Sequence, residues 1–259
     1  MIRIVTVLLT PALLLTAAGL ATATAAESTQ AGGKIPATSH AAPARAPELP
    51  FESSIRYFED GDRQIKTTRP RIVFTGSSSI RMWETLGKDF PRQYVINRGF
   101  GGSQMSDVVH YADRIIVPHK PPLVVVYAGS NDIDAGKTPQ NVASDFKILA
   151  AVVWSRLPET VIAFISIAPN PARWVQADRV REANRLVAAY CRSDRRLRFI
   201  DVFPHMLGTD GKPRPELFIH DGLHMNRKGY EIWIPLVRDT MDAVVPPQVP
   251  SPRVAPSTP

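Results

Sequence analysis

Short, nearly continuous apolar runs alternate with longer amphipathic segments along the middle of the chain. The apolar runs predict strands at Arg71–Thr75, Tyr94–Asn97, Leu123–Tyr127, Val161–Ile167 and Phe199–Val202. The spacing of apolar residues predicts helices at Ser103–Ile116, Pro139–Leu157, Arg173–Arg192 and Arg227–Ala243. Strands that are apolar throughout are typical of parallel sheets that are buried on both faces. The alternation therefore predicts an α/β fold, namely a three-layer α/β/α sandwich with a mostly five-stranded parallel sheet.

The beginning of the chain has a different pattern. Arg3, an apolar run from Ile4 to Leu20 and small residues up to Ala26 are typical of a secretory signal peptide over residues 1–26. An uncleaved membrane anchor is the alternative, but the run is short for a span of roughly 20 residues and Pro11 interrupts it. We therefore expect export to the periplasm or the extracellular space, and no stable membrane anchor.

Two further segments lack the apolar side chains that a core requires. Residues 27–50 and 246–259 consist largely of small residues and proline, so they predict a disordered linker and a disordered Pro-rich tail. Residues 51–245 then form one domain of ordinary size. The sequence gives no indication of the oligomeric state.

The formal net charge of +7 is compatible with binding to nucleic acid or another anionic polymer. The basic residues are dispersed, however, and their densest group lies near a predicted helix end, where cations are favourable. We therefore expect no nucleic-acid partner, whereas weak attraction to anionic polymers or lipid stays open. The single cysteine, Cys191, excludes an intramolecular disulfide and is expected in the core. The densest basic group consists of Arg192, Arg195, Arg196 and Arg198.

Four polar blocks carry the candidate chemistry. Three of them directly follow predicted strands, and ligands of parallel α/β folds bind where the strands end. A serine, backbone and side-chain amides, and a histidine with a carboxylate three residues away are the groups that acyl transfer needs. The blocks are Gly76-Ser77-Ser78-Ser79, Gly101-Gly102, Gly129-Ser130-Asn131-Asp132 and Asp221-Gly222-Leu223-His224. Together they predict a serine esterase.

Each block also has a simpler interpretation. The three serines are typical of a helix N-cap, and the G-x-S-x-G elbow of α/β-hydrolases is absent because Ile80 occupies its second glycine position. The glycine pair is compatible with a plain strand-to-helix turn capped by Ser103, and Asn131 with an ordinary turn.

A metal site is the alternative for the last block. His220, Asp221 and His224 are clustered in the sequence, and histidine and carboxylate are common zinc ligands. Zinc normally takes three or four protein ligands, and no fourth group lies nearby in the sequence. We therefore predict neither a metal ion nor an organic cofactor.

Taken together, the blocks resemble the SGNH (GDSL-type) hydrolase superfamily. The resemblance extends from about Arg71 to Tyr230 and is most specific at Asn97–Gly102, Gly129–Asp132 and Asp221–His224. It implies the flavodoxin-like fold of these hydrolases. The familiar G-D-S motif reads Gly76-Ser77-Ser78 in this chain, a departure that concerns loop geometry and subfamily rather than the reacting groups.

The resemblance also implies a role for each residue. Ser78 is expected to be the nucleophile, His224 the general base, and Asp221 the acid that orients the base. The oxyanion is expected to bind to the backbone N–H groups of Ser78 and Gly102 and to the side-chain amide of Asn131. A shift of register that makes Ser77 or Ser79 the nucleophile stays open.

The predicted function is that of a secreted serine esterase acting on short-chain acyl or acetyl esters. A small-molecule, glycan or lipid ester is the expected substrate, and an O-acetylated polysaccharide suits an exported enzyme. A non-catalytic module that binds polysaccharide or protein is the alternative on the same fold. Phe100, Ile133, Trp174 and Met225 flank the blocks and either line an acyl pocket or pack inside the protein.

Overall fold

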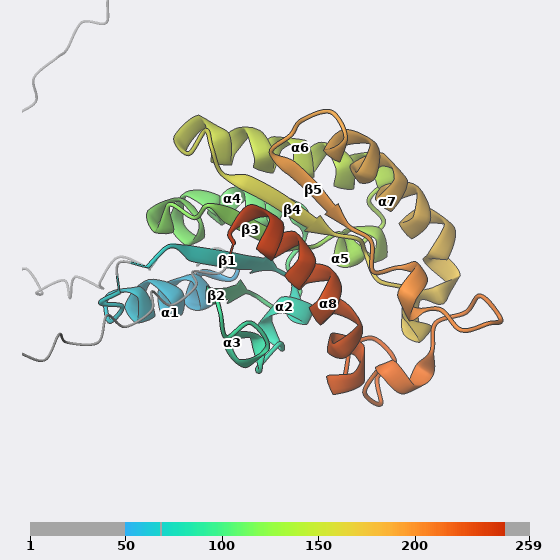
Figure 1. The fold of residues 1–259 in the computed structure, drawn as a ribbon. Helices are drawn as coiled ribbons and strands as arrows, with labels where there is room; N and C mark the ends of the chain where they lie inside the picture. Colours follow the sequence, from blue (N-terminus) through green and yellow to red (C-terminus); the bar gives the residue numbers. More distant parts are fainter. Residues whose placement is uncertain (1–49, 68, 247–259) are drawn as a thin grey trace, which may run out of the picture. The chain divides into compact units, whose positions relative to one another are not determined.

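The computed structural model describes residues 50–67 and 69–246 (Figure 1). The predicted signal peptide over 1–26, the linker up to residue 49 and the tail from residue 247 lie outside the described residues. Within the described part, the strands form one five-stranded parallel sheet in the order β2-β1-β3-β4-β5. The predicted α/β fold and five-stranded parallel sheet are therefore confirmed. The strands are β1 (Arg71–Gly76), β2 (Tyr94–Gly99), β3 (Leu123–Tyr127), β4 (Val161–Ile165) and β5 (Leu197–Ile200).

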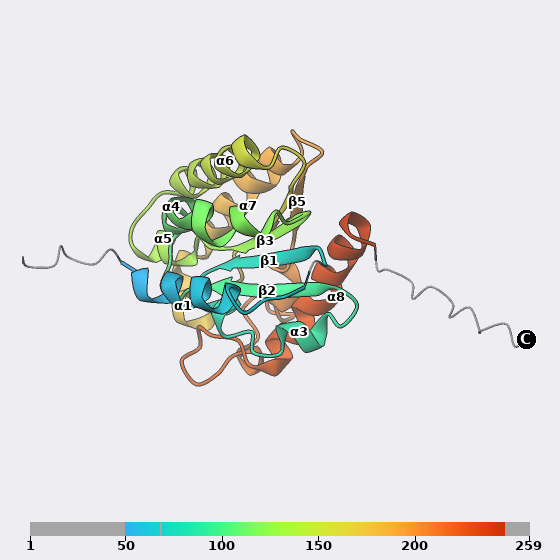
Figure 2. The same cartoon turned by 90° about the vertical axis from the view of Figure 1, so that its left-hand side faces the viewer.

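Helices cover both faces of the sheet (Figures 1 and 2). On one face α1 (Glu52–Asp62), α4 (Met105–Ile115), α6 (Pro139–Arg156) and α7 (Ala177–Cys191) enclose a core with alternate strand residues such as Val124 and Val126. On the other face α2 (Ser78–Arg81), α3 (Leu86–Asp89) and α8 (Arg227–Val244) enclose a second core with Leu123 and Val125. Because successive side chains of a strand point to opposite faces, a strand that is apolar throughout feeds both cores. The remaining helices are α5 (Ser130–Asp134), η1 (Val117–His119), η2 (Pro171–Gln176), η3 (Pro204–Met206) and η4 (Pro215–Leu217).

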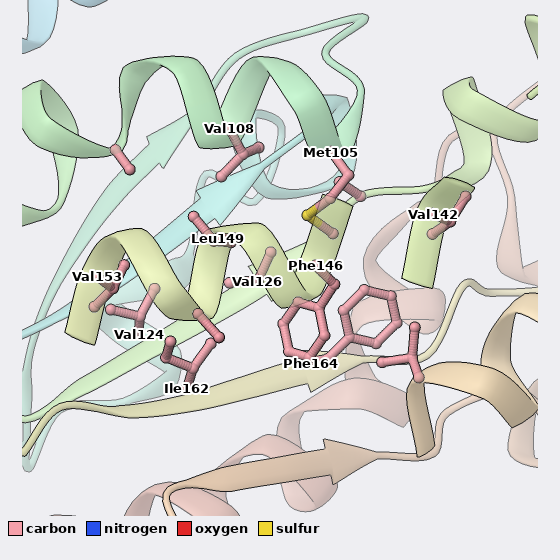
Figure 3. Packing of buried hydrophobic residues seen from close by; sticks show 14 of the residues in the cluster. Met105, Val108, Val124, Val126, Val142, Phe146, Leu149, Val153, Ile162 and Phe164 are labelled. Atoms are coloured by element: carbon pink, nitrogen blue, oxygen red, sulfur yellow. The ribbon is translucent and has the colours of Figure 1, made fainter. Parts of the chain in front are cut away.

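The first core is closely packed between α4, α6 and the sheet (Figure 3). The rings of Phe146 on α6 and Phe164 on β4 meet edge to face with their centroids 5.1 Å apart, an arrangement that aromatic pairs prefer. Cys191, the last residue of α7, is buried as predicted, and burial raises the pKa of its thiol to about 12. A thiol that stays protonated in this way is a packing residue rather than a nucleophile.

Side-chain hydrogen bonds end the last two strands earlier than the apolar pattern predicts. Asn184 on α7 accepts from the N–H of Ile167 at 2.8 Å and donates to its carbonyl at 3.0 Å, so β4 ends before this residue. The hydroxyl of Ser166 likewise accepts from the N–H of Val202 at 2.9 Å, which lies two residues beyond the end of β5. Ile167 and Val202 are therefore buried loop residues, not strand residues.

The structure contains one long helix that the sequence analysis did not identify. Helix α1 carries Ile55, which is fully buried in the first core. Arg114 on α4 binds Glu52 and Glu59 at 2.8 and 2.7 Å, and these two residues lie about two turns apart along α1. The predicted helix over Arg173–Arg192 is divided, because the 3-10 helix η2 runs to Gln176 and α7 begins only at Ala177. The non-helical backbone angles at Arg173 lie within η2. Among residues 50–67 and 69–246, no helix is both long enough and apolar enough to cross a lipid bilayer.

Asp132 connects the loop after β3 to the start of α4. Its carboxylate is fully buried, accepts from the N–H of Met105 at 3.0 and 3.2 Å, and lies 3.2 Å from the ammonium of Lys137. Burial raises the pKa of Asp132, although the N–H of Met105 and the charge of Lys137 oppose the increase. The carboxylate thus fixes two loops at the same edge of the sheet.

Replacing Asp132 with alanine is expected to destabilise the fold. Asp132→Ala leaves the N–H of Met105 without an acceptor in a buried place and should lower the free energy of unfolding by about 1–3 kcal/mol. Urea denaturation followed by circular dichroism measures this loss. Asp239→Ala is the matched control because Asp239 is exposed on α8 and its side chain has no hydrogen bond or ion pair among the described residues. This variant should leave the free energy of unfolding unchanged within experimental error. Equal stability of the two variants would contradict a structural role for Asp132.

Candidate active site

The residues predicted for acyl transfer meet around one cavity. Ser78, Gly102 and Asn131 come from the loops that follow β1, β2 and β3, and His224 comes from the loop before α8. All four line a cavity of about 530 Å³. Asp221, the fifth predicted residue, stands behind His224 and contacts its ring. The structure therefore brings together side chains that are up to 146 positions apart in the sequence.

A glycine places the candidate nucleophile. Gly76 ends β1 with φ +126°, and a Cβ on it would lie 1.9 Å from the carbonyl oxygen of Tyr127 on β3. Only glycine allows this approach, in which the N–H of Ser77 donates to the same oxygen at 2.9 Å. The chain then turns directly into α2, whose first residue is Ser78.

Burial distinguishes the three consecutive serines. Ser77 and Ser79 are 4% and 8% exposed, whereas Ser78 is partly exposed and lines the cavity. Among the hydrogen bonds of the described residues, none uses the backbone N–H of Ser78. At the first position of a helix such an N–H is available to an anion. Ser78 therefore presents both a hydroxyl and a free donor to the cavity.

Hydrogen bonds connect Ser78, His224 and Asp221 in series. The Oγ atom of Ser78 lies 2.8 Å from Nε2 of His224, and Nδ1 of His224 lies 2.6 Å from Oδ2 of Asp221. The other carboxylate oxygen, Oδ1, accepts from the backbone N–H groups of Leu223 and His224 at 2.8 and 2.9 Å. The carboxylate is thus held on one side and aimed at the ring on the other. This geometry gives His224 a proton on Nδ1 and leaves Nε2 as the base toward Ser78.

The same contacts keep Asp221 ionised. Partial burial raises the pKa of its carboxyl, but the hydrogen bonds from the His224 ring and from the backbone N–H groups of His224 and Leu223 lower it by more, to about 2. A carboxylate that accepts several N–H bonds favours its charged form. Asp221 therefore remains an anion over the pH range in which a histidine titrates.

Two further donors face the cavity near Ser78. Gly102 has φ +83°, a left-handed conformation that favours glycine, and no hydrogen bond within the described residues uses its N–H. The side-chain amide of Asn131 donates one hydrogen to the carbonyl of Ser103 at 3.0 Å, and its carbonyl oxygen accepts from Arg173 at 3.0 Å. Because both ends of the amide are fixed, its second N–H hydrogen stays available to a ligand.

Arg173 is a site residue that the sequence analysis missed. Its guanidinium also donates to the hydroxyl of Ser130 at 2.9 Å and pairs with Asp134 at 2.9 Å, so it holds α5 together at the edge of the cavity. Arg173 lies in the segment that follows β4, at the edge of the sheet where ligands of parallel α/β folds bind. This position was a signal that could have identified it as a site residue. Arg81 and Ser54 also line the cavity without having been predicted.

Several neighbouring residues have roles other than those considered from the sequence. Phe100, Ile133 and Met225 are buried, and Trp174 packs against the first core; none of them lines the cavity. Gln104, not Ser103, precedes the first residue of α4, and its N–H donates to Asp107 at 2.8 Å in a capping box. The four flanking apolar residues are therefore packing residues and not an acyl pocket.

The metal alternative finds no support in the side-chain geometry. In the part of the chain that the structure describes, no three histidine, cysteine or carboxylate side chains come together in a way that could hold a metal ion. Asp221 instead directs one carboxylate oxygen to the ring of His224.

Comparison with known proteins finds a family match. Residues 70–232 match the model of the GDSL-like lipase/acylhydrolase family. Curated proteins give no match.

Solved structures share the fold at low sequence identity. A Streptococcus pneumonia protein provisionally named a platelet activating factor has a TM-score of 0.66 at 20% identity, over 73% of this chain and 92% of that chain. A GDSL-like lipase from Bacteroides thetaiotaomicron has a TM-score of 0.63 at 20% identity, over 74% and 98% of the two chains. An acetylxylan esterase from Geobacillus stearothermophilus has a TM-score of 0.56 at 12% identity, over 68% and 94%.

The low pKa of Asp221 is a testable consequence of its contact with His224. In a ¹³C NMR titration the Asp221 carboxyl should titrate at about 2, and in His224→Ala its pKa should rise because the ring hydrogen bond is lost. Since the folded pKa lies below the unfolded value of about 3.9, ionised Asp221 stabilises the fold above that pH. This contribution is lost as the pH falls toward the folded pKa.

Asp194 provides an internal control in the same spectra. Hydrogen bonds from Arg196 lower the pKa of Asp194 to about 2, and this pair lies beside β5, where it makes no contact with His224. Its titration should be the same in both proteins. An Asp221 pKa that does not change in His224→Ala would show that the ring hydrogen bond does not hold the carboxylate.

Proposed function

Because the chain belongs to the GDSL-like lipase/acylhydrolase family and is an ester-bond hydrolase, we propose that it cleaves short-chain acyl esters through an acyl-enzyme on Ser78. The observation that carries this proposal is the continuous hydrogen-bonded series from Ser78 Oγ through the ring of His224 to Asp221, with distances of 2.8 and 2.6 Å. A serine hydroxyl is a weak nucleophile unless a positioned base takes its proton. His224 is in hydrogen-bond reach to do so.

The proposed reaction has two halves. Ser78 Oγ attacks the ester carbonyl carbon while its proton moves to Nε2 of His224, and the carbonyl oxygen becomes an oxyanion. The tetrahedral intermediate then breaks its bond to the alcohol oxygen, which leaves with the proton from His224. A water molecule attacks the acyl-enzyme in the same manner, with His224 again as base, and releases the acid and free Ser78. Asp221 stabilises the charged ring in both halves.

The free donors of the site suit the oxyanion. The backbone N–H groups of Ser78 and Gly102 and the remaining amide hydrogen of Asn131 border the cavity that Ser78 Oγ faces. Donors that are fixed before the reaction stabilise charge without the cost of reorganising. Arg173 and the carbonyl of Ser103 provide this fixation for Asn131.

For the substrate we propose an acetylated carbohydrate outside the cytoplasm, consistent with the export that the first 26 residues predict. The catalytic cavity is lined largely by polar groups and by glycine, including Arg81, Asn131 and Arg173, which favours a small acyl group on a polar alcohol over a long apolar chain. The acetylxylan esterase with the same fold is a precedent for this chemistry. A pure binding module, the alternative, has no need of a serine and a histidine held at 2.8 Å.

The proposed nucleophile can be tested by covalent labelling. A fluorophosphonate probe should label the purified protein and hydrolysis of p-nitrophenyl acetate should be measurable, because both require an activated serine. Ser78→Ala should abolish both activities. Ser77→Ala and Ser79→Ala are the matched controls, since these neighbours are buried, and both should still be labelled.

Each other outcome has a definite meaning. Labelling that persists in Ser78→Ala and disappears in one of the two controls would move the nucleophile to that residue. Folded wild-type protein that is neither labelled nor active would contradict the esterase mechanism and favour the binding module.

The oxyanion role of Asn131 is tested separately. Asn131→Ala should lower kcat for p-nitrophenyl acetate by about 10²–10³, as loss of one oxyanion donor does, while circular dichroism and the unfolding midpoint stay close to wild type. Asn141→Ala is the matched control, because Asn141 lies at the exposed start of α6 and away from the cavity. Wild-type kcat in Asn131→Ala would remove Asn131 from the proposed oxyanion site.

A further inference from the structure

A second cavity adjoins the catalytic one. It has a volume of about 520 Å³ and lies between α1, the α2–α3 segment and the end of β2. Arg81 lines both cavities, and it follows Ser78 by three residues, one turn of α2. Arg81 is therefore the side chain that the two cavities share.

The outer wall of this second cavity comes from a part of the chain that precedes the family match. Residues 70–232 match the family model, whereas Tyr57, Phe58 and Ile65 line the second cavity and Ser54 lines the catalytic one. Helix α1 is firmly held by Arg114 and by the ion pair between Asp62 and Arg98. A fixed helix that is added to a shared catalytic core is a natural source of substrate specificity.

Tyr57 presents an aromatic ring to this cavity. Its side chain is 76% exposed, and it is the one aromatic residue that is mostly exposed within residues 50–67 and 69–246. The ring of Tyr57 makes an edge contact with the ring of Phe58. The guanidinium carbon of Arg98 lies over the Phe58 ring, 5.1 Å from its centroid. A ring that is exposed and fixed in this way offers an apolar face to a ligand in the cavity.

The polar walls of the cavity include Asn97 and Arg98, which bond to Ile80 and to Asp62, and two charged side chains without such partners. Arg81 and Glu84 both line the cavity and are exposed, and neither side chain has a hydrogen bond or an ion pair among the described residues. A guanidinium only donates, and a carboxylate only accepts. An anionic ligand would pair with Arg81 and be repelled by Glu84, and an acyl chain would desolvate both without compensation. A polyol satisfies both, because each hydroxyl donates and accepts.

The position of Arg81 depends on Gly101, in the loop that follows β2. A Cβ on Gly101 would lie 2.8 Å from Nε of Arg81. Because Gly101 has no side chain, the guanidinium of Arg81 has room beside it. Arg81 therefore stands at the junction between the reacting ester and the second cavity.

From these observations we infer that the second cavity is a sugar-binding subsite for the alcohol part of the ester. A sugar ring lies against Tyr57, and its hydroxyls bind Arg81 and Glu84, while the acyl group points to Ser78. This inference rests on the proposed esterase function and adds the residues that select a carbohydrate ester.

Binding can be measured without turnover. In a Ser78→Ala background, acetylated xylotriose, cellotriose and chitotriose are titrated into the protein and followed by NMR. At least one is expected to bind, and adding Tyr57→Ala should weaken it about tenfold, as loss of a central aromatic contact does. Adding Glu84→Gln should weaken it as well, because the neutral amide oxygen is a weaker acceptor than the carboxylate. Ile148→Ala is the control, since Ile148 is exposed on α6 and lines neither cavity.

Kinetics gives a second readout in the enzyme that retains Ser78. The ratio of kcat/KM for the bound acetylated sugar to that for p-nitrophenyl acetate should fall about tenfold in Tyr57→Ala and stay constant in Ile148→Ala. The subsite is overturned if none of the three sugars binds more weakly to the Tyr57→Ala protein, or if Tyr57→Ala instead impairs p-nitrophenyl octanoate, which would make the cavity an acyl site. Turnover of p-nitrophenyl acetate by the wild type tests the esterase function independently of either result.

Discussion

The end of β1 is the point on which the geometry of the catalytic edge depends. The backbone of Gly76 passes so close to β3 that no side chain fits, and this approach lets Ser77 donate to Tyr127 at 2.9 Å. The carbonyl of Gly76 accepts from the N–H of Phe100 at 2.8 Å. One short segment is thereby bonded to the end of β3 and to the loop that follows β2. Because the segments that follow these strands carry Gly102 and Asn131, a displacement of Gly76 would separate the proposed nucleophile from both proposed oxyanion donors.

The histidine side of the site depends on a different set of contacts, made by α8. The phenol of Tyr230 donates to the carbonyl of Ser79 at 3.0 Å, and Arg227 pairs with the buried Asp89 of α3 at 2.8 Å. These bonds dock the start of α8 against α2, so the loop that carries His224 ends beside Ser78. The α2–α3 segment is short, but it is held by this helix and by the aromatic packing of Trp83 with Tyr230, whose ring centroids lie 5.0 Å apart.

Helix α1 illustrates how specificity is added to such a site without changing its chemistry. The residues that meet at the cavity for acyl transfer all belong to the part that matches the family model. Helix α1 lies ahead of that part and packs on α4 through Ile55 and Arg114. From there it reaches the edge of the catalytic cavity with Ser54 and forms a wall of the adjoining one. In the proposed function, the core that matches the family model carries out the reaction, and helix α1 contributes to the selection of the alcohol.

The sequence by itself determined the class of fold and the reacting groups. Continuous apolar runs imply strands buried on both faces, and polar blocks directly after such strands must meet at one edge of a parallel sheet. The meeting of the blocks that contain Ser78, Gly102 and Asn131 followed from this rule, whereas the role of each residue was implied by the resemblance to SGNH hydrolases. The ends of the last two strands could not be predicted in the same way. The side chains of Asn184 and Ser166 accept hydrogen bonds from the backbone N–H groups of Ile167 and Val202, which therefore do not pair with a neighbouring strand. Arg173, Arg81 and Tyr57 carry no motif, and their place at the site depends on which elements pack side by side. Periodicity records what a residue does within its own element, whereas these contacts join segments far apart in the chain, and only the tertiary structure decided them.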